Sequence, residues 1–400
     1  MTMRIGFDGR WYNRSGVGTY VAELLPALAM LPGNFELVLF EDPQNPLPAN
    51  DRLNISRVLV RSSRFSPRAQ FELKTICESQ KIDLFHVPYQ YGAPLFLSCP
   101  LVVTVHDLTP FLFPTRSWLK QLLAVPLVKL GYRMSAHRAS HIICDSHNTA
   151  RDVHNILKVP PKRITAIHLA ASGEHFHPRP HDDDSAAEAE YLFAKYSLRA
   201  PFVLTSSADN WRIKNLSTPL HALDIAHKLS SIDFQTVVYG SHTGLDALGH
   251  SHPALGMNVH RLGYVPVDDL AALLRHASLF ITASLYEGFG LPILEAMSCG
   301  CPVVTSNGGS LAEVAAAGAQ VFDPMDAEGM GRAVATLLRD PEQRYIWRNR
   351  ALARARDFSW LKAAEQTLAV YYKVLGCQNS LQPRFLYSYD DQNPRTQKSA

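Results

Sequence analysis

The sequence predicts an α/β protein built from two doubly wound parallel sheets, each with helices on both faces. The chain has 400 residues, and at about 150 residues per domain this length is enough for two to three domains. Short runs of branched and aromatic residues alternate with helical patterns, which is typical of a parallel sheet covered by helices. A polar stretch rich in Pro, Asp and His, at 175–190, interrupts the alternation and predicts a linker.

The first half of the chain contains five apolar runs with the length of buried strands. They lie at 4–8, 36–40, 83–87, 101–105 and 141–144. The segment 163–169 is a candidate for the last strand of this half. Amphipathic patterns at 19–31 and 67–79 predict helices between the strands.

The alternation restarts after the predicted linker. Six strands are expected, at 202–206, 235–239, 259–262, 279–282, 303–305 and 319–322. Helices are expected at 216–229, 268–276, 292–298, 327–338, 342–356 and 359–375. The predicted limits are a first domain at 1–180, a second at 181–358, a last helix at 359–376 and a tail at 377–400. The polar, irregular tail is expected to be disordered.

The composition limits the functional class. The formal net charge is only +3 and gives no support for nucleic-acid binding. Residues 1–180 carry seven more basic than acidic residues, whereas residues 181–400 carry four more acidic than basic ones. This asymmetry indicates that one half faces something anionic.

The cysteines and the N-terminus indicate the compartment. None of the six cysteines has zinc-ligand spacing, so we expect reduced thiols and no metal. The N-terminus runs straight into a strand-like pattern, without a signal peptide. The most apolar stretch, 93–105, contains two prolines and is too short to cross a bilayer. We therefore expect a cytoplasmic protein, or one that contacts the inner face of the cell membrane.

A glycine-rich stretch follows the strand predicted at 279–282 and reads SLYEGFGLPILEA over residues 284–296. Gly288 and Gly290 let the backbone approach a ligand, and the free N–H groups of the next helix start can hold a phosphate. Glu287 and Glu295 flank this anion site, where their carboxylates can accept hydroxyls of a sugar. Alternatively, Glu287 is a solvated loop residue and Glu295 complements the helix dipole.

Two other turns carry candidate phosphate ligands. Arg212 and Lys214 precede a predicted helix, whose dipole they oppose unless an anion is bound. Gly16 and Gly18 lie in the turn after the first strand, where backbone N–H groups can approach a phosphate. The alternatives are a solvated basic turn and an ordinary strand–helix connection.

His106 and Asp107 directly follow the strand predicted at 101–105. This places them at the carboxyl edge of the sheet, where α/β proteins bind ligands. A histidine there can bind a hydroxyl or carry a proton. Asp107 can instead be a turn or cap residue.

The segment between Asp107 and Asp145 contains no acidic residue but many leucines. Its cations are Arg116, Lys120, Lys129, Arg133 and Arg138. A basic amphipathic pattern of this kind can lie on an anionic membrane surface. The alternative is a helical surface that packs its leucines on the sheet.

Taken together, these residues resemble the retaining glycosyltransferases of family 4. The specific signature is EGFGLP with the Glu-x7-Glu pattern of Glu287 and Glu295, followed by Gly300-Cys-Pro302. Val105-His106-Asp107-Leu108 and Gly16-Val-Gly18-Thr also match typical family positions. The resemblance extends over residues 4–375.

The resemblance implies a GT-B fold, in which two Rossmann-like domains face a central cleft. Residues 1–180 would form the acceptor side, residues 181–358 would bind the donor, and the helix at 359–376 would cross back to the first domain. The implied activity is the retaining transfer of a hexose from a nucleotide-diphosphate sugar to a polysaccharide or a lipid-linked glycan. Neither a metal nor a cofactor is implied.

The resemblance also assigns roles to the candidate residues. Glu287 would contact the donor sugar, Glu295 the ribose, and His106 the sugar near its hydroxymethyl group. Ser206-Ser207-Ala208-Asp209 departs from the Gly-Arg of many members, which removes one usual phosphate cation. Arg212 and Lys214 would hold the diphosphate and are, with His106 and Glu287, the predicted catalytic residues. The remaining donor-binding candidates are Gly16, Gly18, Asp107, Gly288, Phe289, Gly290 and Leu291.

We expect front-face attack, with the β-phosphate oxygen of the donor taking the acceptor proton. GDP-mannose is the favoured donor because this pattern is frequent among mannosyltransferases of bacterial polysaccharides. The alternatives are a UDP-hexose donor and a non-catalytic nucleotide-sugar-binding subunit. EGFGLP argues against an epimerase of this fold, and the absence of an evident cofactor lysine argues against a phosphorylase.

Overall fold

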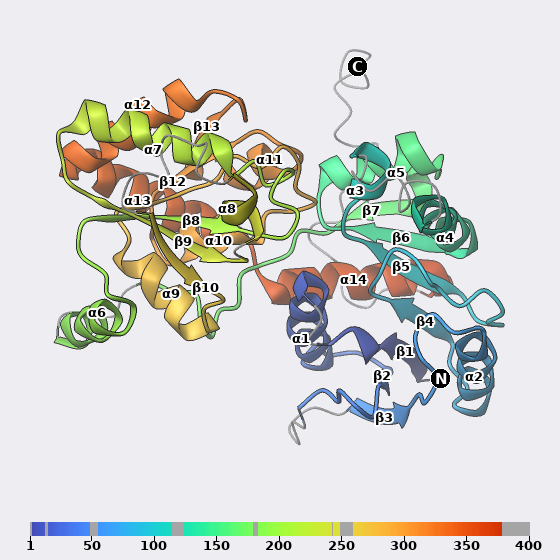
Figure 1. Cartoon of the computed structure of the whole chain (residues 1–400). Coiled ribbons are helices and arrows are strands. Elements are labelled where there is room, and N and C mark those ends of the chain that lie inside the picture. The colour runs from blue at the N-terminus through green and yellow to red at the C-terminus, as the bar shows by residue number, and fades with distance from the viewer. Residues whose placement is uncertain are drawn as a thin grey trace, which may run out of the picture. The chain divides into compact units, whose positions relative to one another are not determined.

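A computed structural model describes residues 2–12, 15–48, 55–113, 124–178, 183–241, 243–248 and 259–377. The chain divides into two compact units. One contains the residues up to Leu169 and those from Ser359 onward, and the other is Ala170–Phe358. Each unit is built on a parallel sheet with helices packed against it (Figure 1), which confirms the predicted fold class.

The first unit contains a seven-stranded sheet in the order β3-β2-β1-β4-β5-β6-β7. The central strands are fully buried, which explains why they read as continuous apolar runs. The edge strand β3 is only half-buried and was not predicted. The strands are β1 (Met3–Asp8), β2 (Phe35–Glu41), β3 (Ile55–Leu59), β4 (Leu84–Val87), β5 (Leu101–Val105), β6 (His141–Cys144) and β7 (Ile164–Ala166).

The two faces of this sheet carry different helices. Phe85 of β4 packs into a core with the helices α2 (Pro67–Ser79), α4 (Val125–Arg138) and α5 (His147–Leu157). The next residue, His86, points to the opposite face because side chains alternate along a strand. There it contacts α14 (Trp360–Leu375), which packs against α1 (Ser15–Ala29). The predicted last helix thus belongs to the first unit.

The second unit contains a six-stranded sheet in the order β10-β9-β8-β11-β12-β13. All six predicted strands are present: β8 (Phe202–Ser207), β9 (Gln235–Gly240), β10 (Val259–Gly263), β11 (Leu279–Ile281), β12 (Val303–Ser306) and β13 (Gln320–Phe322). The helices α7 (Ser217–Ser230) and α12 (Ala327–Arg339) share one core with this sheet. The helix α10 (Leu291–Ser298) packs against α9 (Val267–His276) and α13 (Pro341–Ala355).

The predicted linker at 175–190 is wrong in its second part, because α6 (Asp183–Tyr196) begins within it. The alanines and glutamates of this segment favour a helix over a loop. α6 packs against α9, and Glu188 accepts hydrogen bonds from Arg275 and His276 there. The tail at 378–400 lies outside the described residues.

The remaining described helices are short. They are α3 (Thr109–Leu112), α8 (Thr243–Leu248), α11 (Leu311–Ala315) and the 3₁₀ turns Gly9–Trp11, Pro161–Arg163 and Ala316–Gly318. All six cysteines are free thiols, as expected from their spacing. In the described part of the chain, no helix has both the length and the apolar character needed to cross a bilayer.

Candidate functional site

The second sheet reverses its strand order between β8 and β11. Parallel α/β sheets bind ligands at the carboxyl ends of the strands beside such a reversal. The loop after β8 contains Lys214, and the loop after β11 contains Glu287. The two candidate residues therefore reach the same edge of the sheet from segments that are 73 positions apart in sequence.

Lys214 and Glu287 form an ion pair in which Lys214 Nζ lies 2.6 Å from Glu287 Oε1. Ser284 Oγ donates a second hydrogen bond, of 2.7 Å, to the same oxygen. Both charged side chains keep some solvent contact, with 20% of Lys214 and 16% of Glu287 exposed. One carboxylate oxygen of Glu287 is therefore fixed, and Oε2 has no hydrogen-bond partner among the described side chains and backbone. This second oxygen can accept a ligand hydroxyl.

The loop after β12 supports the Glu287 loop. Ser310 donates to the backbone oxygens of Glu287 and Phe289, at 3.0 and 2.6 Å. Ser306 Oγ donates to the Ser284 backbone oxygen at 2.6 Å. Gly308 lies so close to this loop that a Cβ there would overlap the Ser284 carbonyl oxygen. The Glu287 loop is therefore held by hydrogen bonds and by close backbone packing.

The Gly308→Ala variant is expected to be less stable, because the added methyl group meets backbone rather than a flexible side chain. Overpacking costs about 1–3 kcal/mol, which corresponds to a Tm lowered by roughly 2–12 °C in a unit of this size. Calorimetry of the two proteins measures this shift. The control is Gly173→Ala, since a Cβ there has no heavy atom within 4 Å. Equal Tm values for wild type and Gly308→Ala would show that the two loops do not pack as described.

Glu295 lies one turn into α10, whose N-cap is Gly290 with φ +107°. Burial raises the pKa of Glu295 from its ordinary 4.5 to about 7, and the charge of Lys214 opposes this rise only in part. Tyr239 at the end of β9 lies near the same carboxylate, and burial followed by the Glu295 charge raises the pKa of its phenol. Tyr239 was not among the predicted site residues, because an aromatic residue in a predicted strand is typical of a core.

Arg212 is the second cation in the loop after β8, which also contains Lys214. Its side chain is exposed and stacks over the ring of Trp211, with 4.7 Å from Cζ to the ring centroid. It has no ion-pair partner among the described residues, so it is available to an anion. Asp209 turns away toward Ser241 and Thr243, whose hydroxyls hydrogen-bond to it and lower its pKa. A role for Arg212 at the diphosphate stays a prediction.

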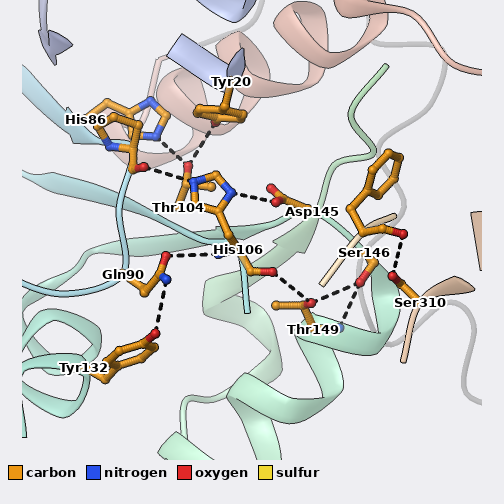
Figure 2. Close-up of polar contacts among 12 residues, drawn as sticks. Tyr20, His86, Gln90, Thr104, His106, Tyr132, Asp145, Ser146, Thr149 and Ser310 are labelled. Atoms are coloured by element: carbon orange, nitrogen blue, oxygen red, sulfur yellow. Dashed lines mark hydrogen bonds and ion pairs between the residues drawn. The ribbon is translucent and has the colours of Figure 1, made fainter. Parts of the chain in front are cut away.

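In the first unit, His106 follows β5 and contacts Asp145, which follows β6 (Figure 2). His106 Nδ1 lies 2.6 Å from Asp145 Oδ2, and Nε2 lies 3.0 Å from the Pro88 backbone oxygen. Burial alone would lower the pKa of His106, but the charge and hydrogen bond of Asp145 outweigh it and raise the pKa. Both ring nitrogens face acceptors, and only a doubly protonated imidazole can satisfy both. The surroundings of His106 therefore favour its imidazolium form.

Asp145 was not among the predicted site residues, although its position after a buried strand carries the same signal as that of His106. Asp145 is almost fully buried, and its Oδ1 has no hydrogen-bond partner among the described residues. Behind it, Thr104 hydroxyl contacts His86 Nε2 at 2.8 Å and the Tyr20 hydroxyl at 3.0 Å. His86 Nδ1 in turn lies 2.6 Å from the Tyr371 hydroxyl of α14. Polar groups therefore connect Tyr371 of the last helix, through His86, to Thr104 at the end of β5, and Figure 2 shows the contacts among His86, Thr104 and Tyr20.

The structure corrects the expectation for Gly16 and Gly18. Both lie in the first turn of α1, which begins at Ser15, and not in a loop. A Cβ at Gly16 would have no neighbour within 4 Å, so the backbone is open to solvent there. Asp107 Oδ1 accepts a 2.9 Å hydrogen bond from the Thr109 amide, which is the behaviour of a turn residue. A ligand-binding role for these three residues stays a prediction.

Two protein-family models match the parts of the chain that contain these residues. Residues 193–354 match the model of the glycosyl transferases group 1, and residues 14–171 match the model of Glycosyltransferase Family 4. The chain belongs to the family 4 glycosyltransferases. The fold and enzyme class implied by the sequence resemblance are thereby confirmed.

Individual relatives of this glycosyltransferase agree with the assignment. The chain is 29% identical over 381 residues to O-antigen chain mannosyltransferase B of Escherichia coli, and the match covers 90% of this chain and 96% of that protein. Sucrose-phosphate synthase from Thermosynechococcus elongatus superimposes with a TM-score of 0.74 at 20% identity, over 94% and 99% of the two chains. The structure of Anabaena Alr3699/HepE in complex with UDP-glucose gives 0.70 at 17% identity, over 93% and 100%. These structures show the GT-B fold.

Proposed function

We propose that this glycosyltransferase moves a mannosyl group from GDP-mannose to a polysaccharide or lipid-linked glycan, with retention of the anomeric configuration. The observation that carries the proposal is the fixed Glu287 carboxylate beside Lys214 at the strand-order reversal. A carboxylate with one free oxygen is suited to a sugar hydroxyl, and a lysine beside it is suited to a diphosphate. The mannosyltransferase activity in the name of the Escherichia coli relative supports mannose.

The chemistry of the transfer follows from the charges in the second unit. The diphosphate would lie at the start of α10, where unpaired backbone N–H groups and the helix dipole favour an anion. Lys214 and the exposed Arg212 would neutralise the charge that develops as the sugar C1–O bond breaks. The acceptor oxygen would bond to C1 from the same face, and its proton would pass to the β-phosphate oxygen. The protein then supplies positioning and charge stabilisation, without a nucleophile or a metal.

The donor and the stereochemistry can be tested directly. The purified chain, incubated with GDP-mannose, is expected to release GDP slowly without acceptor and rapidly with a mannose-terminated oligosaccharide. NMR of the product should show an α-linked mannose, and added EDTA should leave the rate unchanged. Turnover of UDP-glucose but not of GDP-mannose would replace the donor. Nucleotide binding without any turnover would make the chain a nucleotide-sugar-binding subunit.

The raised pKa of Glu295 predicts how nucleotide affinity depends on pH. The carboxylate form can accept both ribose hydroxyls, whereas a protonated carboxyl cannot. With a pKa of about 7, the Kd for GDP should fall about tenfold between pH 6 and pH 8 beyond the titration of GDP itself. Calorimetric titration measures this dependence. Glu295→Gln should abolish it.

The control for this prediction is 2′,3′-dideoxy-GDP, which keeps the diphosphate but lacks the ribose hydroxyls. Its Kd should show the same pH dependence with wild type and with Glu295→Gln. An equal pH dependence for GDP in both proteins would contradict the ribose assignment of Glu295.

We also propose that the enzyme works in the cytoplasm, in peripheral contact with the anionic inner face of the cell membrane. The observation that favours this is α4, which exposes Leu127, Leu130 and Met134 along one side. Lys129 and Arg133 lie over the Phe111 ring beside this apolar stripe. Exposed leucines flanked by cations are typical of helices that lie at an interface.

The structure narrows the set of cations available for membrane contact. Arg138 faces inward and donates to the backbone oxygens of Leu95, Leu97 and Cys99. The predicted contact of Arg138 with lipid is therefore wrong, because its guanidinium N–H groups bind the backbone of residues 95–99. Arg116 and Lys120 lie outside the described residues.

Charge reversal at Lys129 and Arg133 is expected to weaken membrane binding. Each cation near an anionic surface contributes about 1 kcal/mol, so the double glutamate variant should bind at least about tenfold more weakly. Co-sedimentation with phosphatidylglycerol vesicles measures this loss. Leu127→Glu should weaken binding as well, whereas Leu361→Glu, at an exposed leucine of α14, should not. Equal binding of all variants to neutral and anionic vesicles would rule out α4 as the contact.

A further inference from the structure

A group of cations lies at the amino edge of the second sheet, opposite the edge that carries Lys214 and Glu287. Ser278 and Pro302 directly precede β11 and β12 and line a cavity of about 350 Å³ at this edge. The end of α9, Gly300 and one face of α13 complete its lining. The lining includes three arginines, one histidine and no acidic residue.

One part of this charge is already balanced. Arg275 donates to both carboxylate oxygens of Glu188, at 3.0 and 2.5 Å, and His276 Nε2 lies 2.9 Å from Glu188 Oε1. The bidentate pair lowers the pKa of Glu188 in spite of its burial, so the carboxylate stays charged. Arg275 and His276 are therefore held in place by Glu188, whose charge largely neutralises this side of the cavity.

The other two arginines of the cavity are not balanced. Arg344 uses Nη1 to donate to the Leu337 and Leu338 backbone oxygens at the end of α12. Its Nε and Nη2, and the whole guanidinium of Arg348, have no hydrogen-bond or ion-pair partner among the described residues. Both side chains are half-buried. Arg348 lies over Gly300, where a Cβ would be 3.4 Å from its Cζ.

The positions of these arginines favour an anion between them. Arg344 and Arg348 are four residues apart on one face of α13, so their like charges repel. The Ser278 hydroxyl, also without a partner in the described part of the chain, adds a neutral donor to the same cavity. Two planar guanidinium groups and a hydroxyl supply donors for at least three acceptor oxygens, the number that a terminal phosphate presents.

We propose that this cavity binds the phosphate group of a small phosphorylated molecule. Its volume is near the lower limit of small-molecule sites, and the exposed ring of Tyr345 provides an apolar surface for the organic part of the ligand. The three-residue strand β11, about 10 Å long, separates the two edges of the sheet. A ligand here is therefore bound apart from the diphosphate of the donor.

Calorimetric titration of the full chain with glycerol 3-phosphate tests the proposal. Saturable binding is expected for wild type, for Lys214→Ala and for the control Arg350→Gln, whose guanidinium stacks on Trp347 outside the cavity. Arg348→Gln should weaken binding at least tenfold, and Arg348→Lys should restore part of it. Loss of binding in Lys214→Ala but not in Arg348→Gln would overturn the proposal, as would no saturable binding by wild type.

A competition experiment identifies the source of the phosphate. Vesicles containing phosphatidic acid present the same phosphate group on a lipid headgroup. Displacement of glycerol 3-phosphate by these vesicles, but not by phosphatidylcholine vesicles, would assign the cavity to a membrane lipid. Undiminished binding in their presence would assign it to a soluble phosphate ester.

Discussion

Replacing Glu287 by alanine is expected to lower kcat about 100-fold while GDP continues to bind. Glu287 Oε1 is held by Lys214 and Ser284, so the proposed sugar contact falls to the other carboxylate oxygen. A hydrogen bond to a charged group contributes about 1.5–3 kcal/mol, which corresponds to roughly 10- to 150-fold in rate. The alanine variant loses this contact but leaves Lys214 without its counter-ion. Affinity for GDP should therefore be unchanged or higher.

This opposite behaviour of kcat and nucleotide affinity distinguishes a sugar contact from general damage to the loop. Steady-state kinetics with GDP-mannose gives the first quantity and calorimetry with GDP gives the second. Glu287→Gln should recover part of the rate, because its amide oxygen can still accept from Lys214 while its amide nitrogen can donate to a sugar hydroxyl. Glu328→Ala, at an exposed acid of α12, is the matched control. A parallel loss of GDP binding in Glu287→Ala would place this residue at the nucleotide rather than at the sugar.

Most strands of the two sheets were predictable because they are buried on both faces, and the half-buried edge strands β10 and β13 were also predicted. β5 and β6 are continuous apolar runs and were predicted to the residue. β3 was missed, because an edge strand with exposed residues such as Arg57 lacks this signal. The start of α6 was read as a linker, because its stabilising partners on α9 are distant in sequence.

The candidate site was predictable where one short motif contains it. Glu287, Gly290 and Glu295 lie within nine residues, and their positions after a strand and at a helix start follow from the motif alone. The pairing of Glu287 with Lys214 depends on which strands are neighbours, and the sequence does not specify this order. The pairing of Asp145 with His106 depends in the same way on β5 and β6 lying side by side.

Asp145→Asn is expected to lower kcat about 10- to 100-fold and to change its pH dependence. Asp145 is a positioning residue, whose charge and hydrogen bond raise the pKa of His106 against the effect of burial. Without that charge, burial dominates and the imidazole becomes neutral at neutral pH. A neutral ring has one donor instead of two and no charge. His106 then loses its positive charge and one of the two N–H donors that hold the ring beside Asp145 and Pro88.

The direction in which the pH dependence of activity changes tests this role of Asp145. Wild-type activity should fall as pH rises through the raised pKa of His106, and Asp145→Asn should move this fall to lower pH. The pair also stabilises the fold below the ordinary histidine pKa of 6.5, and this contribution is lost as pH rises through the folded-state value.

Double-variant kinetics completes the test of this pair. His106→Ala combined with Asp145→Asn should be no slower than His106→Ala alone, since Asp145 acts through the ring. Asp152→Asn in α5, which removes a nearby acid that pairs with Asn148 instead, should leave the pH profile unchanged. NMR titration of the His106 ring gives a reading that does not depend on turnover. An identical His106 titration in wild type and Asp145→Asn would contradict the role of Asp145, because the hydrogen bond of 2.6 Å would then carry no charge effect to the ring.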